Sequence, residues 1–123
     1  MRTASLRRPR SERKRVAVKI FPAAKERILE IWQYTQRTWS EKQADKYVRS
    51  LVAAINRSQY ERHRWRPVMD ECLKGVFFIR FQRHLIFFRE LSKGTLGVIS
   101  ILHDNMEIPS RLREDAERGD DGI

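Results

Sequence analysis

The fold is decided by residues 75–103, which read GVFFIRFQRHLIFFRELSKGTLGVISILH. Three apolar runs follow one another in this stretch: Gly75–Phe81, His84–Glu90 and Leu96–His103. Runs of this length that are rich in Val, Ile and Phe indicate β-strands. Only Gln82-Arg83 and a Ser-Lys-Gly-Thr turn at 92–95 separate them, and links this short join antiparallel neighbours. We therefore predict an antiparallel meander of three strands.

Both faces of this meander are apolar. Phe77 and Ile79 would lie on one face of their strand, while Val76 and Phe78 would lie on the other. A sheet with one face in water should instead alternate apolar and polar residues. We expect helices to cover one face. For the other face two covers remain open: the chain's own C-terminal residues with the 57–74 loop, or a partner segment or second copy.

The residues before the meander predict a strand and a helical hairpin. Val16–Phe21 is rich in β-branched residues, and Pro22 suits the first position of a helix. Apolar residues then recur at helical spacing as far as Trp39. Ser40 to Gln43 has the form of a capping box, which starts a second helix immediately after the first. Two helices joined so tightly are antiparallel neighbours.

Helical spacing also assigns faces within this hairpin. Trp32, Trp39, Tyr47 and Leu51 are expected to be mainly core residues or contacts between the two helices. Asp45 and Arg49 are spaced for an i,i+4 ion pair on the outer face. The predicted fold class is α+β, in the order β-αα-βββ, with an antiparallel sheet packed on the hairpin. Pro109 can open a short last helix that runs through Leu112.

Charge divides the chain into three parts. The formal net charge is +10, from 26 Lys+Arg and 16 Asp+Glu. Residues 1–15 hold seven basic groups and one acid, whereas residues 114–123 hold five acids and one arginine. Such segments bury too little apolar surface to offset the entropy of ordering. We predict a basic disordered arm at 1–15, a folded domain at 16–113 and an acidic disordered tail at 114–123.

Composition and motifs exclude several classes of protein. The apolar runs are far shorter than the roughly 20 residues that span a bilayer, and no secretory signal opens the chain. The single cysteine, Cys72, cannot build a disulfide framework or a cysteine-based zinc site. No phosphate loop, nucleophile elbow or metal-ligand cluster is present. We expect a small basic intracellular protein without metal or cofactor, whose partner is acidic.

One group of basic residues could carry chemistry. Its members are Arg80, Arg83, His84, Arg89, His103 and Arg111. Cleavage of RNA needs a group that deprotonates the 2′-hydroxyl, a group that protonates the leaving oxygen, and cations for the transition state. Histidine and arginine supply all three if the meander gathers them at one end of the sheet. The alternative is that the arginines are solvated strand-end charges and the histidines are structural.

Three motifs occur in order at fitting distances along the chain. They are Trp39-Ser40-x-x-Gln43-Ala44-x-x-Tyr47, Arg83-His84-x-Ile86-Phe87-Phe88-Arg89 and Ile99-x-Ile101-Leu102-His103. Together they resemble the ParE branch of the RelE/ParE toxins of bacterial toxin–antitoxin modules, over about residues 16–112. The predicted β-αα-βββ order is similar to that family's fold. The resemblance implies a cytoplasmic bacterial toxin that stabilises the cleaved-DNA complex of DNA gyrase without a catalytic residue or cofactor.

The resemblance also implies partners and site residues. A ParD-like antitoxin would neutralise the toxin in a hetero-oligomer, through Trp32, Trp39, Tyr47, Leu51, Phe78 and Phe88. The target would be contacted through Arg83, Arg89 and Arg111, and the basic surface would permit a direct contact with nucleic acid. The alternative is the RelE branch, which cleaves mRNA on the ribosome. The catalytic groups would then come from Arg80, Arg83, His84, Arg89 and His103.

Overall fold

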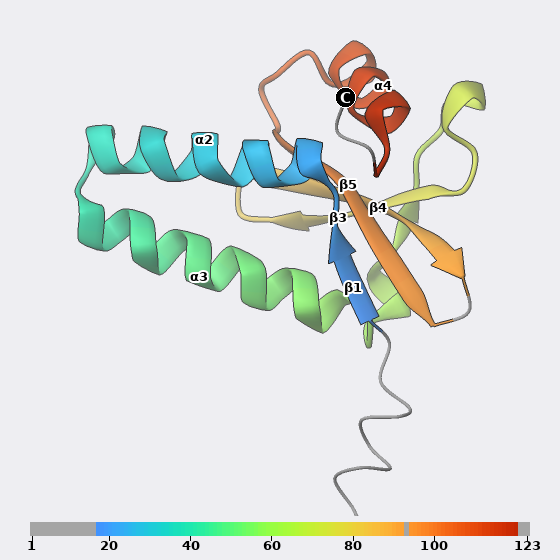
Figure 1. Ribbon diagram of the computed structural model, residues 1–123, viewed down its shortest axis with the longest axis horizontal. Helices are drawn as coiled ribbons and strands as arrows, with labels where there is room; N and C mark the ends of the chain where they lie inside the picture. Colours follow the sequence, from blue (N-terminus) through green and yellow to red (C-terminus); the bar gives the residue numbers. More distant parts are fainter. Residues whose placement is uncertain (1–16, 93, 121–123) are drawn as a thin grey trace, which may run out of the picture.

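A single five-stranded sheet lies between a helical hairpin and a C-terminal helix in the computed structural model, which describes residues 17–92 and 94–120 (Figure 1). The elements in chain order are β1 (Ala17–Ile20), α2 (Pro22–Thr38), α3 (Glu41–Ser58), η1 (Arg62–Arg64), β2 (Arg66–Pro67), η2 (Glu71–Leu73), β3 (Val76–Phe81), β4 (His84–Ser92), β5 (Thr95–His103) and α4 (Ile108–Arg118). The predicted arm at 1–15 and Val16 of the predicted first strand lie outside the described residues.

The predicted meander forms the centre of the sheet. β3 pairs with β4 and β4 with β5, both antiparallel, while β1 runs parallel beside β5. The tight connection is confirmed at Gln82, whose φ of 58° closes the turn between β3 and β4. The sequence pattern does not indicate β2, because a strand of two residues is too short to show periodicity. The α+β class and the β-αα-βββ order are otherwise confirmed.

The hairpin begins and turns where local chemistry predicts. Pro22 is the first residue of α2, and the Ser40 hydroxyl accepts a hydrogen bond from the Gln43 N–H at 3.0 Å, which caps α3. Figure 1 shows α2 and α3 running side by side in opposite directions. The Asp45–Arg49 ion pair does not form. The Asp45 carboxylate instead accepts a hydrogen bond from the Trp32 indole N–H at 2.9 Å.

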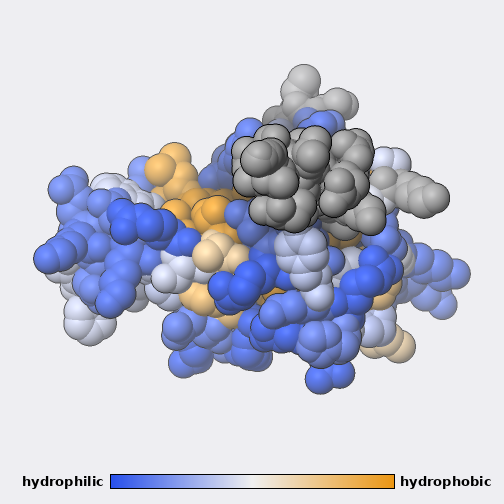
Figure 2. Space-filling view, turned by 90° about the horizontal axis from the view of Figure 1, so that it is seen from below, coloured by the Kyte–Doolittle hydropathy of each residue, from blue (hydrophilic) through white to orange (hydrophobic). Residues whose placement is uncertain are grey.

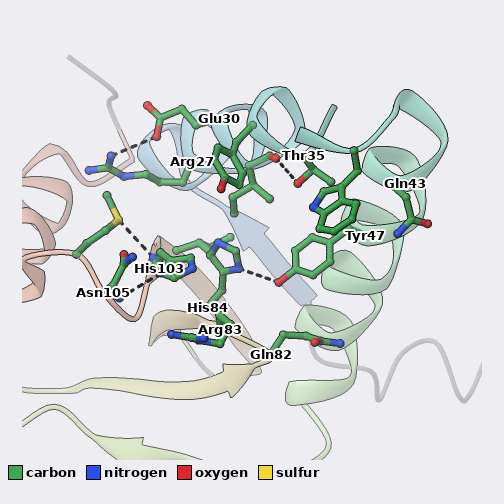
Figure 3. A pocket seen from close by; sticks show the side chains of 15 residues that line it. Arg27, Glu30, Thr35, Gln43, Tyr47, Gln82, Arg83, His84, His103 and Asn105 are labelled. Carbon is green, nitrogen blue, oxygen red and sulfur yellow. Dashed lines mark hydrogen bonds and ion pairs between the residues drawn. The ribbon is translucent and has the colours of Figure 1, made fainter. Parts of the chain in front are cut away.

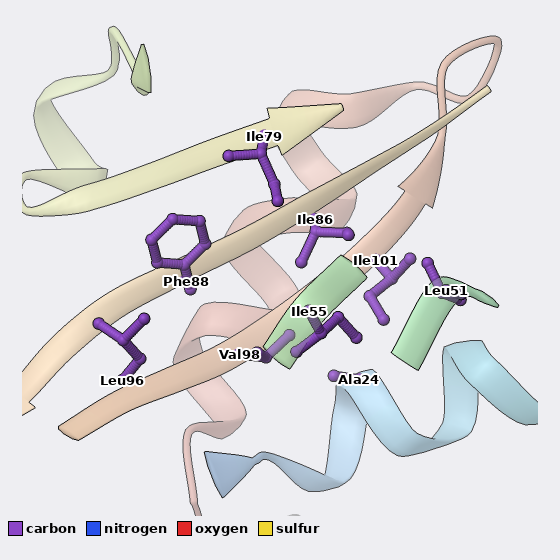
Figure 4. Close-up of a cluster of buried hydrophobic side chains, with 9 residues drawn as sticks. All are labelled: Ala24, Leu51, Ile55, Ile79, Ile86, Phe88, Leu96, Val98 and Ile101. Carbon is purple, nitrogen blue, oxygen red and sulfur yellow. The ribbon is translucent and has the colours of Figure 1, made fainter. Parts of the chain in front are cut away.

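Two hydrophobic clusters sit on the two faces of the sheet. The first joins the hairpin to the central strands, and Figure 4 shows Leu51 of α3 beside Ile101 and Ile55 of α3 beside Val98. The second includes Leu73, Val76, Phe87, Ile99, Leu102 and Leu112. α4 and the loop before β3 therefore cover the second face, so the chain supplies its own cover. This decides between the two covers that the sequence leaves open.

A β-bulge in β5 sets which side chains face the hairpin. Phe87 of β4 pairs with Ser100, whereas the next residue, Phe88, pairs with Val98, so Ile99 is an extra residue. Val98 before the bulge and Ile101 after it both belong to the hairpin-side cluster, although three residues separate them. The extra residue changes the phase of the inward and outward alternation within the strand.

The acidic tail prediction is wrong for residues 114–118, because α4 continues to Arg118. Asp115 explains the error: it is 3% exposed and points inward rather than into water. Its carboxylate accepts hydrogen bonds from Ser100 Oγ at 2.6 Å and from Arg27 Nε at 3.0 Å. The tail is predicted only from the many charged residues in this segment. In the helix, Leu112 and Asp115 lie together on the buried side.

The substitution Asp115→Ala should lower the free energy of unfolding by about 3 kcal/mol. Removing the carboxylate leaves the largely buried Arg27 guanidinium and the buried Ser100 hydroxyl without their acceptor. Urea denaturation measures the change. Glu114→Ala removes the same charge from the exposed side of the same helix and should change stability by less than about 0.5 kcal/mol. Equal effects of the two substitutions would contradict a structural role for the buried carboxylate.

Candidate binding groove

A groove of about 560 Å³ opens between the hairpin and the ends of β4 and β5 (Figure 3). Helix α2 supplies an apolar and aromatic wall, α3 supplies Tyr47, and the strands supply two histidines. The lining residues are Arg27, Glu30, Ile31, Tyr34, Thr35, Trp39, Gln43, Tyr47, Gln82, Arg83, His84, Ile101, His103, Asn105 and Met106. The groove therefore combines aromatic surface with a few polar groups, which is the usual composition of a binding site.

A chain of three rings lies along the floor of the groove. The Tyr47 hydroxyl and His84 Nδ1 are hydrogen-bonded at 2.8 Å, and Figure 3 shows the two side chains pointing toward each other from α3 and β4. His84 lies opposite His103 in the sheet, with ring centroids 5.1 Å apart in an edge-to-face arrangement. Asn105 donates its N–H to His103 Nδ1 at 3.1 Å. The same nitrogen lies 3.3 Å from Asp104 Oδ1.

Burial, and after it the neighbouring His103, lower the pKa of His84 to about 4. Burial likewise raises the pKa of Tyr47 above its ordinary value. Both side chains are therefore uncharged near neutral pH. They form a hydrogen-bonded pair that orients the groove floor. A general acid or base works best when its pKa lies near the working pH, so His84 is poorly suited to proton transfer there.

Two arginines at the mouth of the groove bind the same carboxylate. Asp104 accepts hydrogen bonds from Arg83 Nε at 2.9 Å and from Arg80 Nη1 at 3.0 Å. Hydrogen bonds from Arg83 and then Arg80 lower the pKa of Asp104 to about 2. Two guanidinium groups against one carboxylate leave a net charge of +1, and Arg83 remains largely exposed beside the groove. This arrangement can attract an anionic group on a ligand.

The structure brings part of the predicted basic set together. Arg80, Arg83, His84 and His103 gather at one end of the sheet. Arg89 lies five residues farther along β4, roughly 17 Å away. The buried Nε atom of Arg89 has no hydrogen-bond acceptor among the described residues. Arg111 is exposed on α4, on the opposite side of the sheet from the hairpin. The six residues therefore do not form one site.

The six residues predicted to contact an antitoxin are also dispersed. Trp39 and Tyr47 line the groove, but Leu51 and Phe88 are 0% and 1% exposed. Their burial contradicts the prediction that a partner touches them. Trp32 is partly buried between α2 and α3, whereas Phe78 borders a hollow under the start of α4.

The expectation that Trp39 is a core residue is wrong, because Trp39 is 72% exposed. It lies in the link after α2, beyond the part of the hairpin that rests on the sheet. Helical spacing gives the face of a residue, but it does not show where a helix extends past its support. Tyr34, which is 61% exposed, carries no signal in the sequence beyond its place one position from the apolar residues of the helix. Asn105 carried no signal, since it lies in a turn.

A metal centre or membrane span is not found within residues 17–92 and 94–120. No group of three or more His, Cys, Asp and Glu side chains there could hold a metal ion. The helices of the described chain are too short or too polar to cross a bilayer. Cys72 is an exposed free thiol outside the groove.

Comparison with known proteins identifies similar sequences and folds. Residues 18–108 match the family model described as ParE toxin of type II toxin-antitoxin system, parDE. The chain is 33% identical over 93 residues to a protein named Toxin ParE1 from Mycobacterium tuberculosis, strain CDC 1551 / Oshkosh. That match covers 76% of this chain and 94% of the relative, and the protein of the same name from strain H37Rv gives the same values.

Two solved structures share the fold. One, titled "Chromosomal ParDE TA system from P. aeruginosa", has a TM-score of 0.61 at 16% identity and covers 72% of this chain and 95% of that chain. The other is the toxin-antitoxin complex RelBE2 from Mycobacterium tuberculosis, with a TM-score of 0.55 at 13% identity. It covers 72% of this chain and 91% of that chain. At these identities the two likenesses concern the fold alone.

His84 should make the stability of the protein depend on pH between about 6.5 and 4. The unfolded chain, with the ordinary pKa of 6.5, binds a proton in this range that the folded chain does not bind. Stability is then complete above pH 6.5 and falls as the pH drops toward 4. In His84→Gln the side chain does not titrate, so the loss of unfolding free energy between pH 7 and 5 should be smaller than in the wild type.

Urea denaturation at several pH values measures this difference. The carboxylates whose pKa is lowered, such as Asp104 and Glu90, are present in both the wild type and His84→Gln, so the comparison of the two proteins isolates His84. His63→Gln is the matched control, because His63 is exposed in η1 and away from the groove. Identical pH profiles for the wild type and His84→Gln would show that His84 is not held neutral.

Proposed function

This chain belongs to the ParE toxin family of type II toxin–antitoxin systems, and on that premise we propose that it inhibits DNA gyrase by binding. The proposal includes stabilisation of the cleaved-DNA complex, neutralisation by a ParD-like antitoxin and action in the bacterial cytoplasm. Membership of the ParE rather than the RelE branch supports gyrase as the target. The sequence motifs that carry the resemblance lie in described elements that build the groove or support it.

The observation that carries the proposal is the uncharged pair of Tyr47 and His84. A ribonuclease would place a proton acceptor or donor with a pKa near 7 at the centre of this groove. The histidine with the best position has its pKa lowered to about 4 by burial, and its Nδ1 is occupied by the Tyr47 hydroxyl. A fixed, neutral floor under an exposed aromatic rim favours recognition over acid–base catalysis.

The groove also supports a site for the antitoxin. Exposed Trp39 and Tyr34 offer aromatic anchors, and the half-buried Tyr47 forms the floor between them and the sheet. Aromatic side chains of this kind carry much of the energy of protein interfaces. Arg83 at the mouth adds a cation for an acidic segment. An antitoxin segment in the groove would cover Arg83 and block its contact with the target.

A second candidate function rests on a specific observation. Arg80, Arg83, His84 and His103 do meet at one end of the sheet, as a ribonuclease would require. The fold is also similar to a chain of the RelBE2 complex. Ribosome-dependent cleavage of mRNA is therefore the alternative, in which His84 or His103 would transfer the proton.

A supercoiling assay with the purified protein separates the two functions. We expect gyrase to lose supercoiling activity and cleaved DNA to accumulate. His84→Ala should weaken inhibition through lost contact only, so a higher concentration of the variant should restore full inhibition. The gyrase proposal is overturned in favour of the ribonuclease by two results together. The wild-type protein leaves supercoiling normal and cuts mRNA on ribosomes, and His84→Ala does not cut mRNA at any concentration.

Trp39→Ala should weaken binding of the antitoxin's C-terminal segment by about tenfold to a hundredfold, because it removes an anchor at the groove rim. The exposed side chain contributes little to the core, so thermal unfolding should change little. Isothermal titration calorimetry measures the affinity. Tyr60→Ala is the control: Tyr60 is 58% exposed but does not line the groove. Equal losses from the two substitutions would place the antitoxin elsewhere.

A further inference from the structure

The outer side of α3 carries a line of basic side chains that the groove does not use. Lys42, Lys46, Arg49 and Arg57 are exposed and follow one another at helical spacing, with Ala53 between the last two. At 100° per residue they fall within about 80° of one another around the helix. The buried residues Ala44, Leu51, Ala54 and Ile55 occupy the opposite side. We call these four residues the basic stripe.

No acidic side chain among the described residues forms an ion pair with the basic stripe. Its four side chains form no ion pair there, whereas most arginines elsewhere in the described chain are paired with acids, as in Arg62–Glu90 and Arg113–Asp70. α3 itself contains two acids, Glu41 and Asp45. Both lie on the flank of the helix, and Asp45 accepts the Trp32 indole N–H instead of pairing with Arg49. Arg49 is thereby left without an ion pair among the described residues.

The character of the surface around the stripe favours phosphate over protein. The large exposed hydrophobic side chains of the described chain are Leu29, Tyr34, Trp39, Tyr60, Met69 and Leu91, and α3 contributes none of them. Figure 2, which views the molecule from below and thus from the α3 side, shows mostly hydrophilic side chains with a smaller hydrophobic area among them. A protein interface needs buried aromatic or aliphatic anchors, whereas the backbone of a nucleic acid is recognised by lysine and arginine alone.

The length of the stripe suits a double helix. Lys42 and Arg57 are 15 positions apart, which corresponds to about 22 Å along the helix axis. A DNA duplex rises 3.4 Å per base pair, so this length follows phosphates over about six base pairs. Ala53 and the neighbouring Ser50 are small, so they leave room for the phosphates between the longer side chains.

We propose that the basic stripe of α3 binds the phosphate backbone of double-stranded DNA. The contact is independent of base sequence, because it uses cations and no base-reading side chains. It lies outside the groove, so the protein can hold a duplex and a protein partner on different surfaces. The proposal holds whether the protein target is gyrase or the ribosome, and its test does not require either.

Fluorescence anisotropy with the full chain and a labelled 20-base-pair DNA duplex tests the proposal. The logarithm of the association constant falls linearly with the logarithm of the salt concentration. Four phosphate contacts should make this slope steeper by about 3.6 than in a protein that lacks them. Changing Lys42, Lys46, Arg49 and Arg57 together to Gln should remove most of that slope. Affinity at 50 mM salt should fall by more than about tenfold. The substituted positions are exposed, so thermal unfolding should remain close to that of the wild type.

A variant with Lys25, Arg37, Arg66 and Lys74 changed to Gln is the matched control. It removes the same charge from exposed positions on other elements and should change the slope by less than one unit. An RNA duplex of the same length distinguishes the two sources of phosphate, since stripe-dependent binding to RNA alone would assign RNA as the ligand. The proposal is overturned if the control variant loses as much affinity as the stripe variant. It is also overturned if polyglutamate shows the stronger dependence on the stripe.

Discussion

Apolar side chains on both faces of β3, β4 and β5 are the constraint from which the rest of the fold follows. Strands of this kind cannot leave either face in water, so each face requires its own cover. The hairpin covers one face through Leu51 and Ile55, and α4 with the loop before β3 covers the other. The Asp115 carboxylate connects the second cover to α2 and β5, which fixes all three layers relative to one another.

Elements whose pattern extends over many residues could be predicted from the sequence, whereas features whose geometry depends on a few residues could not. The meander, the hairpin and the Ser40 cap follow from periodicity and local chemistry. β2 and the length of α4 do not, because two residues carry no period and Asp115 looks like solvent-facing charge. Within the site, the meeting of His84 and His103 follows from antiparallel pairing. The exposure of Trp39 depends on how far the hairpin extends past the sheet.

The helical hairpin offers two surfaces of opposite character. Tyr47 on the inner side of α3 helps build a groove with an exposed aromatic rim and an uncharged floor. The outer side of the same helix carries cations without large apolar side chains. Groups buried in the groove favour a partner that fits its shape, whereas exposed cations favour any surface of sufficient negative charge. Salt should therefore affect the two interactions very differently.

The bulge at Ile99 has a consequence for how the groove could change in evolution. Because the alternation of the strand is shifted at this residue, Ile101 faces the hairpin and His103 stands opposite His84. The same residues paired without a bulge would alternate regularly from Val98 and turn both side chains toward α4. The groove histidine thus depends on the pairing of β5 as well as on its sequence. Loss of the codon for Ile99 alone would instead restore a regular strand that keeps Ile101 and His103 on the hairpin side, so the groove tolerates a change in strand length that removes only the extra residue.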